Sequence, residues 1–421
     1  MTLLNLQSAF GICAIIALAW LFSERRREFP WRVVLTGVVI QISLAAIFLN
    51  VPIMRDALLS LNVVVEAIQF ATKAGTSFVF GYIGGSDQVP FTITNPAAMG
   101  NFAFQILPSL MVIGALSALA WHWRVLPAFV AAMSWALRRT LGIGGAVGVS
   151  CGANVFLGTI ESPLLIKPYL DRLTRSELFI VFSCGMANAS GTILVFYAFV
   201  LGPVVGPSAL GHIIIASLLS LPASIVIALV MIPGKETTPA DSGVGHSYHG
   251  NMDAVARGTT DGLAMFLQII AMLVVMVALV ELANYMLGVF GDVWGAPLTF
   301  QRMAGWAFAP VAWAIGIPWD EALDAGRLLG LKFILNEVFA YLEQARIQSV
   351  SPDALSARTD LMMLYALCGF ANFSSVGITI AGVTVLAPNR RQEIVQLAQR
   401  SLISGTLASL MVGATIGLMP Y

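Results

Sequence analysis

The sequence predicts an all-α polytopic membrane protein with eight transmembrane helices and two opposed re-entrant hairpins. Hydrophobic residues make up 58% of the 421 residues and charged residues only 10%, against roughly 25% charged in soluble domains. Apolar runs of about 18 residues or more, long enough to cross a bilayer, recur along the chain. Two further apolar stretches are interrupted by glycine, proline and charged residues. The net charge of zero argues against a nucleic-acid partner.

The eight membrane-spanning segments are expected at residues 5–22, 33–50, 103–121, 177–201, 209–232, 260–290, 361–388 and 398–420. The first lacks a basic n-region and a clear cleavage site, so we expect a membrane helix there and not a removed signal peptide. Residues 54–75 mix charges with apolar side chains, which is typical of an amphipathic helix at the membrane interface.

The two interrupted stretches are each expected to form two half-length helices that enter and leave on the same side. Glycines and a proline divide residues 142–168, and prolines, a glycine and three acidic residues divide residues 303–342. Such irregular backbone is tolerated at membrane depth only where protein or a cavity covers it. We therefore expect the two hairpins to surround a site.

The distribution of positive charge predicts the orientation. Most of the 22 lysine and arginine residues fall in segments that lie inside when the N- and C-termini are outside, as the positive-inside preference requires. This places the first hairpin on the cytoplasmic side and the second on the outer side. The absence of large soluble domains favours a bacterial inner (plasma) membrane, crossed many times.

The order hairpin, span, span occurs twice with opposite orientation, which is typical of alternating-access transporters with inverted repeats. The sequence therefore predicts an inverted-repeat transport domain on a scaffold domain. The expected parts are scaffold spans and interfacial helices in 1–141, the first repeat in 142–232, a disordered cytoplasmic linker in 233–259, a long scaffold span in 260–302 and the second repeat in 303–421.

Other classes of protein lack support in the residues. Four cysteines lie within apolar segments and are expected to be small hydrophobic residues, and the four histidines show no metal-ligand spacing. An intramembrane enzyme would need a nucleophile with a base, or metal ligands. A channel would need polar rings along a pore, whereas the polar residues here converge on the hairpins. We expect no enzymatic activity and no cofactor, only a coupling cation.

Three polar motifs carry a family resemblance. They are Gly158-Thr-Ile-Glu-Ser-Pro-Leu-Leu-Ile166, Asn336-Glu-Val-Phe-Ala-Tyr341 and Gly369-Phe-Ala-Asn-Phe-Ser-Ser-Val-Gly377. With them the chain resembles the concentrative nucleoside transporter family, whose corresponding motifs read Gly-Gln-Thr-Glu-Ala-Pro-Leu-Leu-Ile, Asn-Glu-Phe-Val-Ala-Tyr and Gly-Phe-Ala-Asn-Phe-Ser-Ser. The resemblance implies a homotrimer in the lipid bilayer, each subunit an elevator-type secondary active symporter that imports nucleosides with a cation, sodium being favoured over protons.

The resemblance also assigns residues. Those expected to bind the nucleoside are Thr159, Ile160 and Glu161 at the base, Glu337, Asn372 and Ser375 at the ribose hydroxyls, and Ile193 and Phe370 packing against the base. Those expected to bind the cation are Asn154, the Leu157 carbonyl, Asn188 and Ser190. Carboxylates accept N–H and O–H donors, and amides and hydroxyls both donate and accept, so these residue types suit a neutral, hydroxyl-rich solute.

Each assignment has a structural alternative. Glu161 could cap a half-helix N-terminus, and Glu337 could pair with Lys332 or Arg327. Asn372 and Ser375 could join packed spans, and the two apolar residues could be core. Thr159 and Ile160 depart from the Gln and Thr of the family motif. The base preference, and a change of substrate, therefore stay open.

Overall fold

The computed structural model describes residues 3–93, 101–190, 193, 196–197, 200–201, 209–234, 236–238, 248–293 and 295–419. Ten residues of the predicted linker 233–259, His246 among them, lie outside these residues, as does part of the predicted span 177–201. The last residues of that linker, 251–259, are helical. The regular secondary structure of the described chain is helical apart from one short antiparallel hairpin, β1 (Asp292–Val293) with β2 (Ala296–Pro297), in which Asp292 is opposite Pro297. The all-helical prediction is confirmed.

Helices in the first part of the chain follow the predicted apolar runs, with one addition. They are α1 (Leu3–Leu21), α2 (Trp31–Asn50), α3 (Pro52–Phe80), η1 (Gly81–Gly84), η3 (Phe102–Ile106), α4 (Ser109–His122) and α5 (Val125–Leu141). The helix α3 is longer at both ends than the interfacial helix expected at 54–75. The helix α5 was not expected, because arginines and polar residues interrupt its apolar pattern.

The first interrupted stretch, residues 142–168, forms short helices. Of the spans that follow it, one is divided and two are continuous. The elements are α6 (Gly145–Ala153), α7 (Glu161–Leu164), α8 (Lys167–Leu170), α9 (Arg175–Ala187), α11 (Ala209–Met231) and α12 (Asn251–Leu287). The break between α6 and α7 agrees with the two half-helices predicted at 142–168. The predicted span 177–201 is divided, because α9 ends at Ala187 and residues 188–190 are not helical.

Helices also alternate with breaks in the last third of the chain. They are η5 (Gly288–Phe290), α13 (Phe300–Ala314), α14 (Ala322–Ile334), α15 (Glu337–Val350), α16 (Ala357–Leu367), α17 (Phe373–Leu386), η6 (Pro388–Arg390) and α18 (Arg391–Gly417). The stretch 303–342 contains two breaks, at 315–321 and at 335–336. Pro310 lies inside α13 without ending it. The stretch therefore holds parts of three helices and not the two half-length helices expected.

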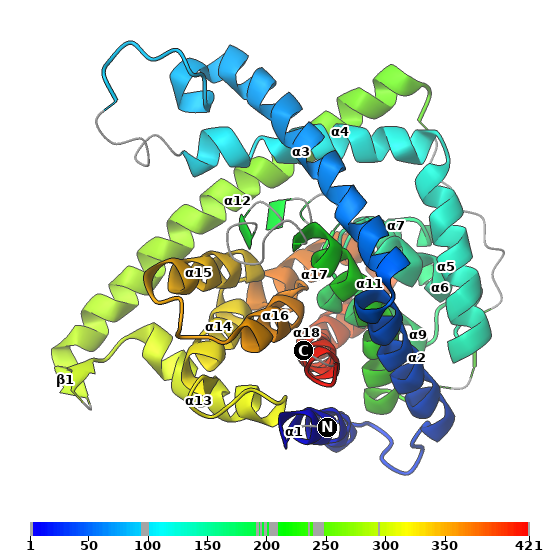
Figure 1. Ribbon diagram of the computed structural model, residues 1–421. Helices are drawn as coiled ribbons and strands as arrows, with labels where there is room; N and C mark the ends of the chain where they lie inside the picture. Colours follow the sequence, from blue (N-terminus) through cyan, green and yellow to red (C-terminus); the bar gives the residue numbers. More distant parts are fainter. Residues whose placement is uncertain are drawn as a thin grey trace.

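Figure 1 shows α18 near the centre of the molecule, with α4 and α12 along its edge. The central helices α9, α11 and α18 pack on one another, and nearly every residue of α11 is buried. A helix that is apolar on all sides is expected in such a place. By length and composition, five helical segments of the described chain could cross a membrane: 3–21, 31–50, 102–122, 209–231 and 251–290.

The helices α1 and α2 contact the central helices. The helix α1 packs along α18, and α2 packs along α11. By contrast, α12 packs mainly along α4, and only 12% of its most apolar window is buried. Hydropathy alone does not distinguish a helix that packs on the central helices from one that is largely exposed, because lipid and a protein core are equally apolar surroundings.

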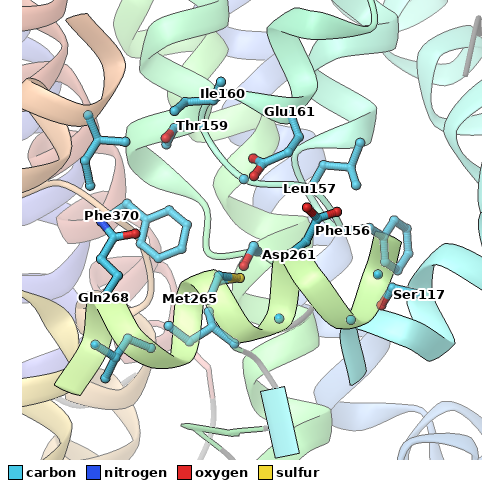
Figure 2. A pocket seen from close by; sticks show the side chains of 18 of the residues that line it. Ser117, Phe156, Leu157, Thr159, Ile160, Glu161, Asp261, Met265, Gln268 and Phe370 are labelled. Carbon is cyan, nitrogen blue, oxygen red and sulfur yellow. The ribbon is translucent and has the colours of Figure 1, made fainter. Parts of the chain in front are cut away.

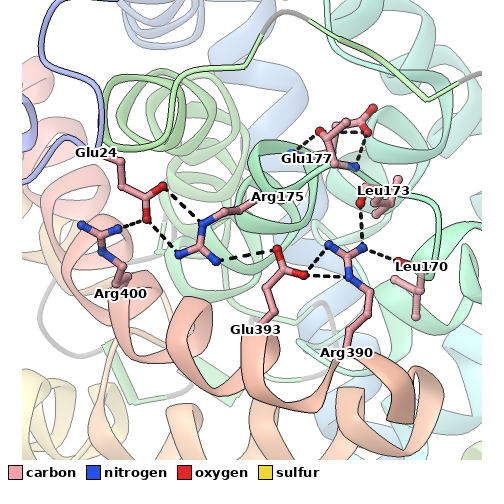
Figure 3. A network of polar contacts seen from close by, with 9 residues as sticks. Glu24, Leu170, Leu173, Arg175, Glu177, Arg390, Glu393 and Arg400 are labelled. Atoms are coloured by element: carbon pink, nitrogen blue, oxygen red, sulfur yellow. Dashed lines mark hydrogen bonds and ion pairs between the residues drawn. The ribbon is translucent and has the colours of Figure 1, made fainter.

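A cluster of charges ties the loop after α1 to the central helices (Figure 3). Arg175 at the start of α9 lies 2.9 Å from Glu24, and Arg400 of α18 also pairs with Glu24. Glu393 lies 2.7 Å from Arg390, which donates to the carbonyl oxygens of residues 170 and 173. The hydrogen bond from Arg175 holds the pKa of Glu24 below its usual range.

Candidate functional site

A cavity of about 730 Å³ lies where the broken helices meet. Four breaks contribute to its lining: the loop between α6 and α7, the segment after α9, the junction of α14 and α15, and the junction of α16 and α17. The opposite side of the cavity is formed by α4 and α12, as Figure 2 shows for α12. The volume falls within the roughly 300–1,000 Å³ typical of small-molecule pockets.

The structure brings all the predicted substrate residues to this one cavity: Thr159, Ile160, Glu161, Ile193, Glu337, Phe370, Asn372 and Ser375. Two of the predicted cation ligands, Leu157 and Ser190, also line it. The other two, Asn154 and Asn188, do not line the cavity and are buried, each with 1% of its surface exposed. Residues 150 or more positions apart in sequence therefore converge.

Glu337 is held by two donors. The Tyr197 hydroxyl donates to Oε1 at 2.6 Å, and Asn372 Nδ2 donates to Oε2 at 3.0 Å. Glu337 opens α15, where the side chain of the preceding Asn336 accepts from the backbone N–H of Phe339 at 3.1 Å and caps the helix. The polar side chains at this break are therefore fixed by local helix capping and by contacts between helices.

Asn372 has two roles in the same cluster. Its Oδ1 accepts from the backbone N–H of Ser375 at 2.9 Å and caps α17, while its Nδ2 donates to Glu337. The amide orientation follows from these partners, because only the oxygen can accept from a backbone N–H. Asn372 thereby links the start of α17 to the start of α15, which is more than the general packing role considered for it.

The two basic residues considered as ion-pair partners of Glu337 contact other groups in the structure. Arg327 lies 2.6 Å from Glu343. The Lys332 ammonium donates to the Ala366 carbonyl oxygen at 2.8 Å, near the end of α16. Both basic residues therefore have partners other than Glu337.

Glu161 and the two residues before it form the other polar edge of the cavity. Glu161 begins α7, and its carboxylate lies over Gly158, where an added Cβ would stand 2.4 Å from Oε2. Thr159 packs against Gly185, whose Cβ position is 3.4 Å from the threonine methyl. Ile160 packs on Gly382 of α17, at 2.5 Å from the corresponding Cβ position. Small residues on the neighbouring helices therefore make room for this loop.

Two of the breaks cross each other. Gly369, with φ of +128°, lies against the end of α9, and a Cβ there would stand 2.4 Å from the Ala187 carbonyl oxygen. The next residue, Phe370, donates its backbone N–H to the Asn188 carbonyl oxygen at 3.3 Å. Only glycine fits such a position, because it tolerates both the positive φ and the close backbone. The crossing sets Phe370 at the cavity.

Asn188 presents an unusual oxygen. Its Nδ2 donates to the Cys184 carbonyl oxygen at 3.0 Å, but its buried Oδ1 has no hydrogen-bond partner. Asn154 uses its Oδ1 to accept from Ser162 at 2.9 Å, and its buried amide nitrogen has no partner. Since unsatisfied buried polar atoms are rare, the Asn188 oxygen fits a cation. No cluster of three or more His, Cys, Asp or Glu residues suited to a metal occurs in the described chain.

Several residues of the site were not predicted. Tyr197 lies in an apolar run and gave no signal. Asp261, Met265 and Gln268 line the cavity from α12. Polar residues at 261 and 268 within an apolar helix are two turns apart on one face, and this spacing could have identified them.

Comparisons with known proteins place the chain in a family. Three family models match: "Na+ dependent nucleoside transporter N-terminus" over residues 10–83, "Nucleoside recognition" over 103–204 and "Na+ dependent nucleoside transporter C-terminus" over 212–417. The nucleoside permease NupC of Helicobacter pylori is 33% identical over 419 residues, covering 98% of this chain and 97% of NupC. The chain belongs to the Na+ dependent nucleoside transporter family. It is thus a multi-pass membrane transporter and not an enzyme, as predicted.

Solved structures of this transporter family share the fold. CNTnw in an inward-facing substrate-bound state has a TM-score of 0.89 and 31% identity, covering 99% of this chain and 98% of CNTnw. A double variant of CNTnw in an outward-facing state has a TM-score of 0.90 and 30% identity, with the same coverage. The resemblance stated from the three motifs is confirmed.

Proposed function

We propose that this protein is a secondary active symporter that imports nucleosides across the bacterial inner membrane, coupled to a cation gradient and to sodium in particular. The observation that carries the proposal is the convergence of all eight predicted substrate residues on one cavity between four helix breaks. Broken helices that meet in this way are how many secondary transporters build their binding sites.

The ribose is assigned to the cluster around Glu337. A carboxylate offers about four acceptor positions, and Tyr197 and Asn372 use two of them. About two remain for two of the three hydroxyl groups of a nucleoside's ribose. Ser375 lies in the same lining and can donate or accept. This match of acceptors to donors supports a ribonucleoside over an apolar or anionic solute.

The base is assigned to the opposite end of the cavity. Phe370 and Ile193 offer apolar surface for a flat ring, and Glu161 and Thr159 offer polar atoms at its edge. Ile160 has no hydrogen-bonding atom and packs on Gly382. We therefore expect little direct recognition of the base by Ile160.

In this proposal sodium is transported together with the nucleoside. The proposed ligands are Asn154, the Leu157 carbonyl, Asn188 and Ser190, all of them neutral oxygen donors of the kind that unwound transporter helices offer. The unpartnered Asn188 oxygen supports this assignment. The Asn188 oxygen could not carry a coupling proton instead, because an amide does not titrate.

The movement is proposed to be of the elevator type, in a homotrimer with the termini outside. The pairing of α4 with α12, apart from the packed central helices, supports a separate scaffold. In this proposal α1 and α2, which contact the central helices, belong with α4 and α12 to the scaffold. The two hairpins would be α6 to α8 and α14 to α15, whose breaks line the cavity.

The test is uptake of labelled uridine and adenosine into proteoliposomes under an inward sodium gradient, an inward proton gradient or neither. Accumulation above equilibrium under sodium alone is the expected result, and Asn188→Ala should lower the apparent sodium affinity by about tenfold or more. Accumulation driven only by protons would favour the alternative ion. Saturation without accumulation would indicate a facilitated carrier, and no saturable uptake would indicate another substrate.

A further inference from the structure

The side of the cavity formed by α12 carries its own polar groups. Asp261, Met265 and Gln268 line the cavity, at spacings of four and three residues that place them on one helical face. Figure 2 shows the Asp261 carboxyl on the side of the cavity facing Glu161, and Gln268 beside Phe370. None of these residues belongs to the ribose cluster or to the proposed sodium ligands.

The neighbouring face of α12 fixes this orientation. Gly258 and Gly262 lie against α4, where an added Cβ would stand 2.4 Å from the carbonyl oxygens of Gly114 and Leu110, respectively. The reciprocal position at Gly114 would stand 2.4 Å from the Gly258 carbonyl oxygen. If α12 were rotated about its axis, larger side chains would replace these glycines at the contact with α4, where there is no space for them. Asp261 is therefore held toward the cavity.

The loop between α6 and α7 supplies few polar atoms by comparison. Ile160 packs on Gly382, the methyl of Thr159 faces Gly185, and Glu161 is the one charged group of the loop. A base bound between this loop and α12 would thus meet one carboxylate on each side.

We propose that Asp261 is a specificity-determining residue which, together with Glu161, makes the carrier prefer bases with an exocyclic amino group. An ionised carboxylate only accepts hydrogen bonds. An amino group carries two N–H donors and can donate one to each carboxylate, whereas a keto oxygen in its place would set acceptor against acceptor. The proposal rests on the proposed nucleoside transport.

Two matched pairs of nucleosides carry this difference. Cytidine and uridine differ by amino and keto groups at one ring position, and by a bare nitrogen or an N–H at the ring position next to it, and so do adenosine and inosine. A lost hydrogen bond to a charged group lowers affinity by about 10- to 150-fold, so the amino member of each pair should compete for uptake at least about tenfold better.

The experiment measures inhibition of labelled cytidine uptake by each of the four nucleosides in proteoliposomes. Asp261→Asn should reduce the amino-to-keto preference in both pairs by about fivefold or more, because an amide also donates. The control Asp292→Asn, at an exposed position outside the cavity, should keep the wild-type preference. If Asp261→Asn does not accumulate as folded protein, Asp261→Ser is measured in the same way.

The outcomes separate the two proposals. Transport by the wild type without an amino preference, or a preference unchanged in the Asp261 variants, would overturn the role of Asp261 and leave nucleoside transport standing. Absence of any nucleoside uptake by folded wild-type protein would instead overturn the proposed function itself.

Discussion

The ribose assignment makes a sharp prediction for Glu337→Gln. The substitution keeps the size of the side chain but replaces one acceptor oxygen with an NH2 group. In the structure both carboxylate oxygens already accept from donors, Tyr197 on one and Asn372 on the other. The new NH2 group would therefore face a donor, and only one oxygen would remain to accept.

The size of the effect follows from counting acceptors. Of about four acceptor positions on the carboxylate, about two are left for ribose hydroxyls. The amide retains about two in total, and the existing donors compete for them. At least one charge-assisted hydrogen bond to the substrate is lost, which costs about 1.5–3 kcal/mol. That loss lowers kcat/KM by about 10- to 150-fold.

Initial rates of sodium-driven uptake in proteoliposomes measure this, with the amount of folded protein checked by size-exclusion chromatography. Glu281→Gln is the matched control, because Glu281 is exposed on α12 and outside the cavity; its kcat/KM should be unchanged. A folded Glu337→Gln transporter within threefold of the wild type would refute the acceptor count, and with it the placing of the ribose.

Two further predictions concern stability. Gly369→Ala would combine a positive φ with a Cβ only 2.4 Å from the Ala187 carbonyl oxygen. The melting temperature of this variant in detergent should therefore fall well below that of Gly377→Ala, in which the added Cβ meets open space. Equal melting temperatures would contradict the crossing of the two breaks. For Glu24, the hydrogen bond from Arg175 lowers the folded-state pKa. Its stabilisation is therefore full at neutral pH and is lost as the pH falls below about 4. Melting temperatures measured from pH 7 to pH 3 should fall more steeply for the wild type than for Glu24→Gln, and parallel curves would argue against the pair.

Most helices could be predicted because a membrane requires long apolar runs. The runs at 5–22, 33–50 and 209–232 correspond closely to α1, α2 and α11. The sequence did not reveal that α1 and α2 pack on the central helices. An apolar face that contacts lipid and one that contacts protein have the same composition.

Most breaks could be predicted from glycine or proline, and one from a pair of polar residues. Residues 154–160 lie between glycines and a proline, and the break there was predicted. The break at Leu335–Asn336 has neither residue, and it is marked only by the asparagine that caps α15. Conversely, Pro310 predicted a break that its helix does not have. Hairpin limits therefore depend on capping and tertiary contacts that apolar patterns do not encode.

Seven of the eight residues expected to bind the substrate lie within short motifs, and the sequence could therefore indicate them together. Their partners in the structure lie outside these motifs. Tyr197 approaches Glu337 across 140 residues of sequence, and nothing near it in the chain indicates that contact. Asp261 and Gln268 lie on a helix outside the motifs.

The hydrogen bond from Phe370 to Asn188 has a thermodynamic consequence. It joins the residue proposed to pack on the base to the one proposed to hold sodium, through backbone atoms 3.3 Å apart. A cation that fixes Asn188 would thereby order Phe370 before the solute arrives. Linkage makes this reciprocal: if sodium raises nucleoside affinity tenfold, about 1.4 kcal/mol, the nucleoside must raise sodium affinity tenfold. At this junction each solute would act as the effector of the other.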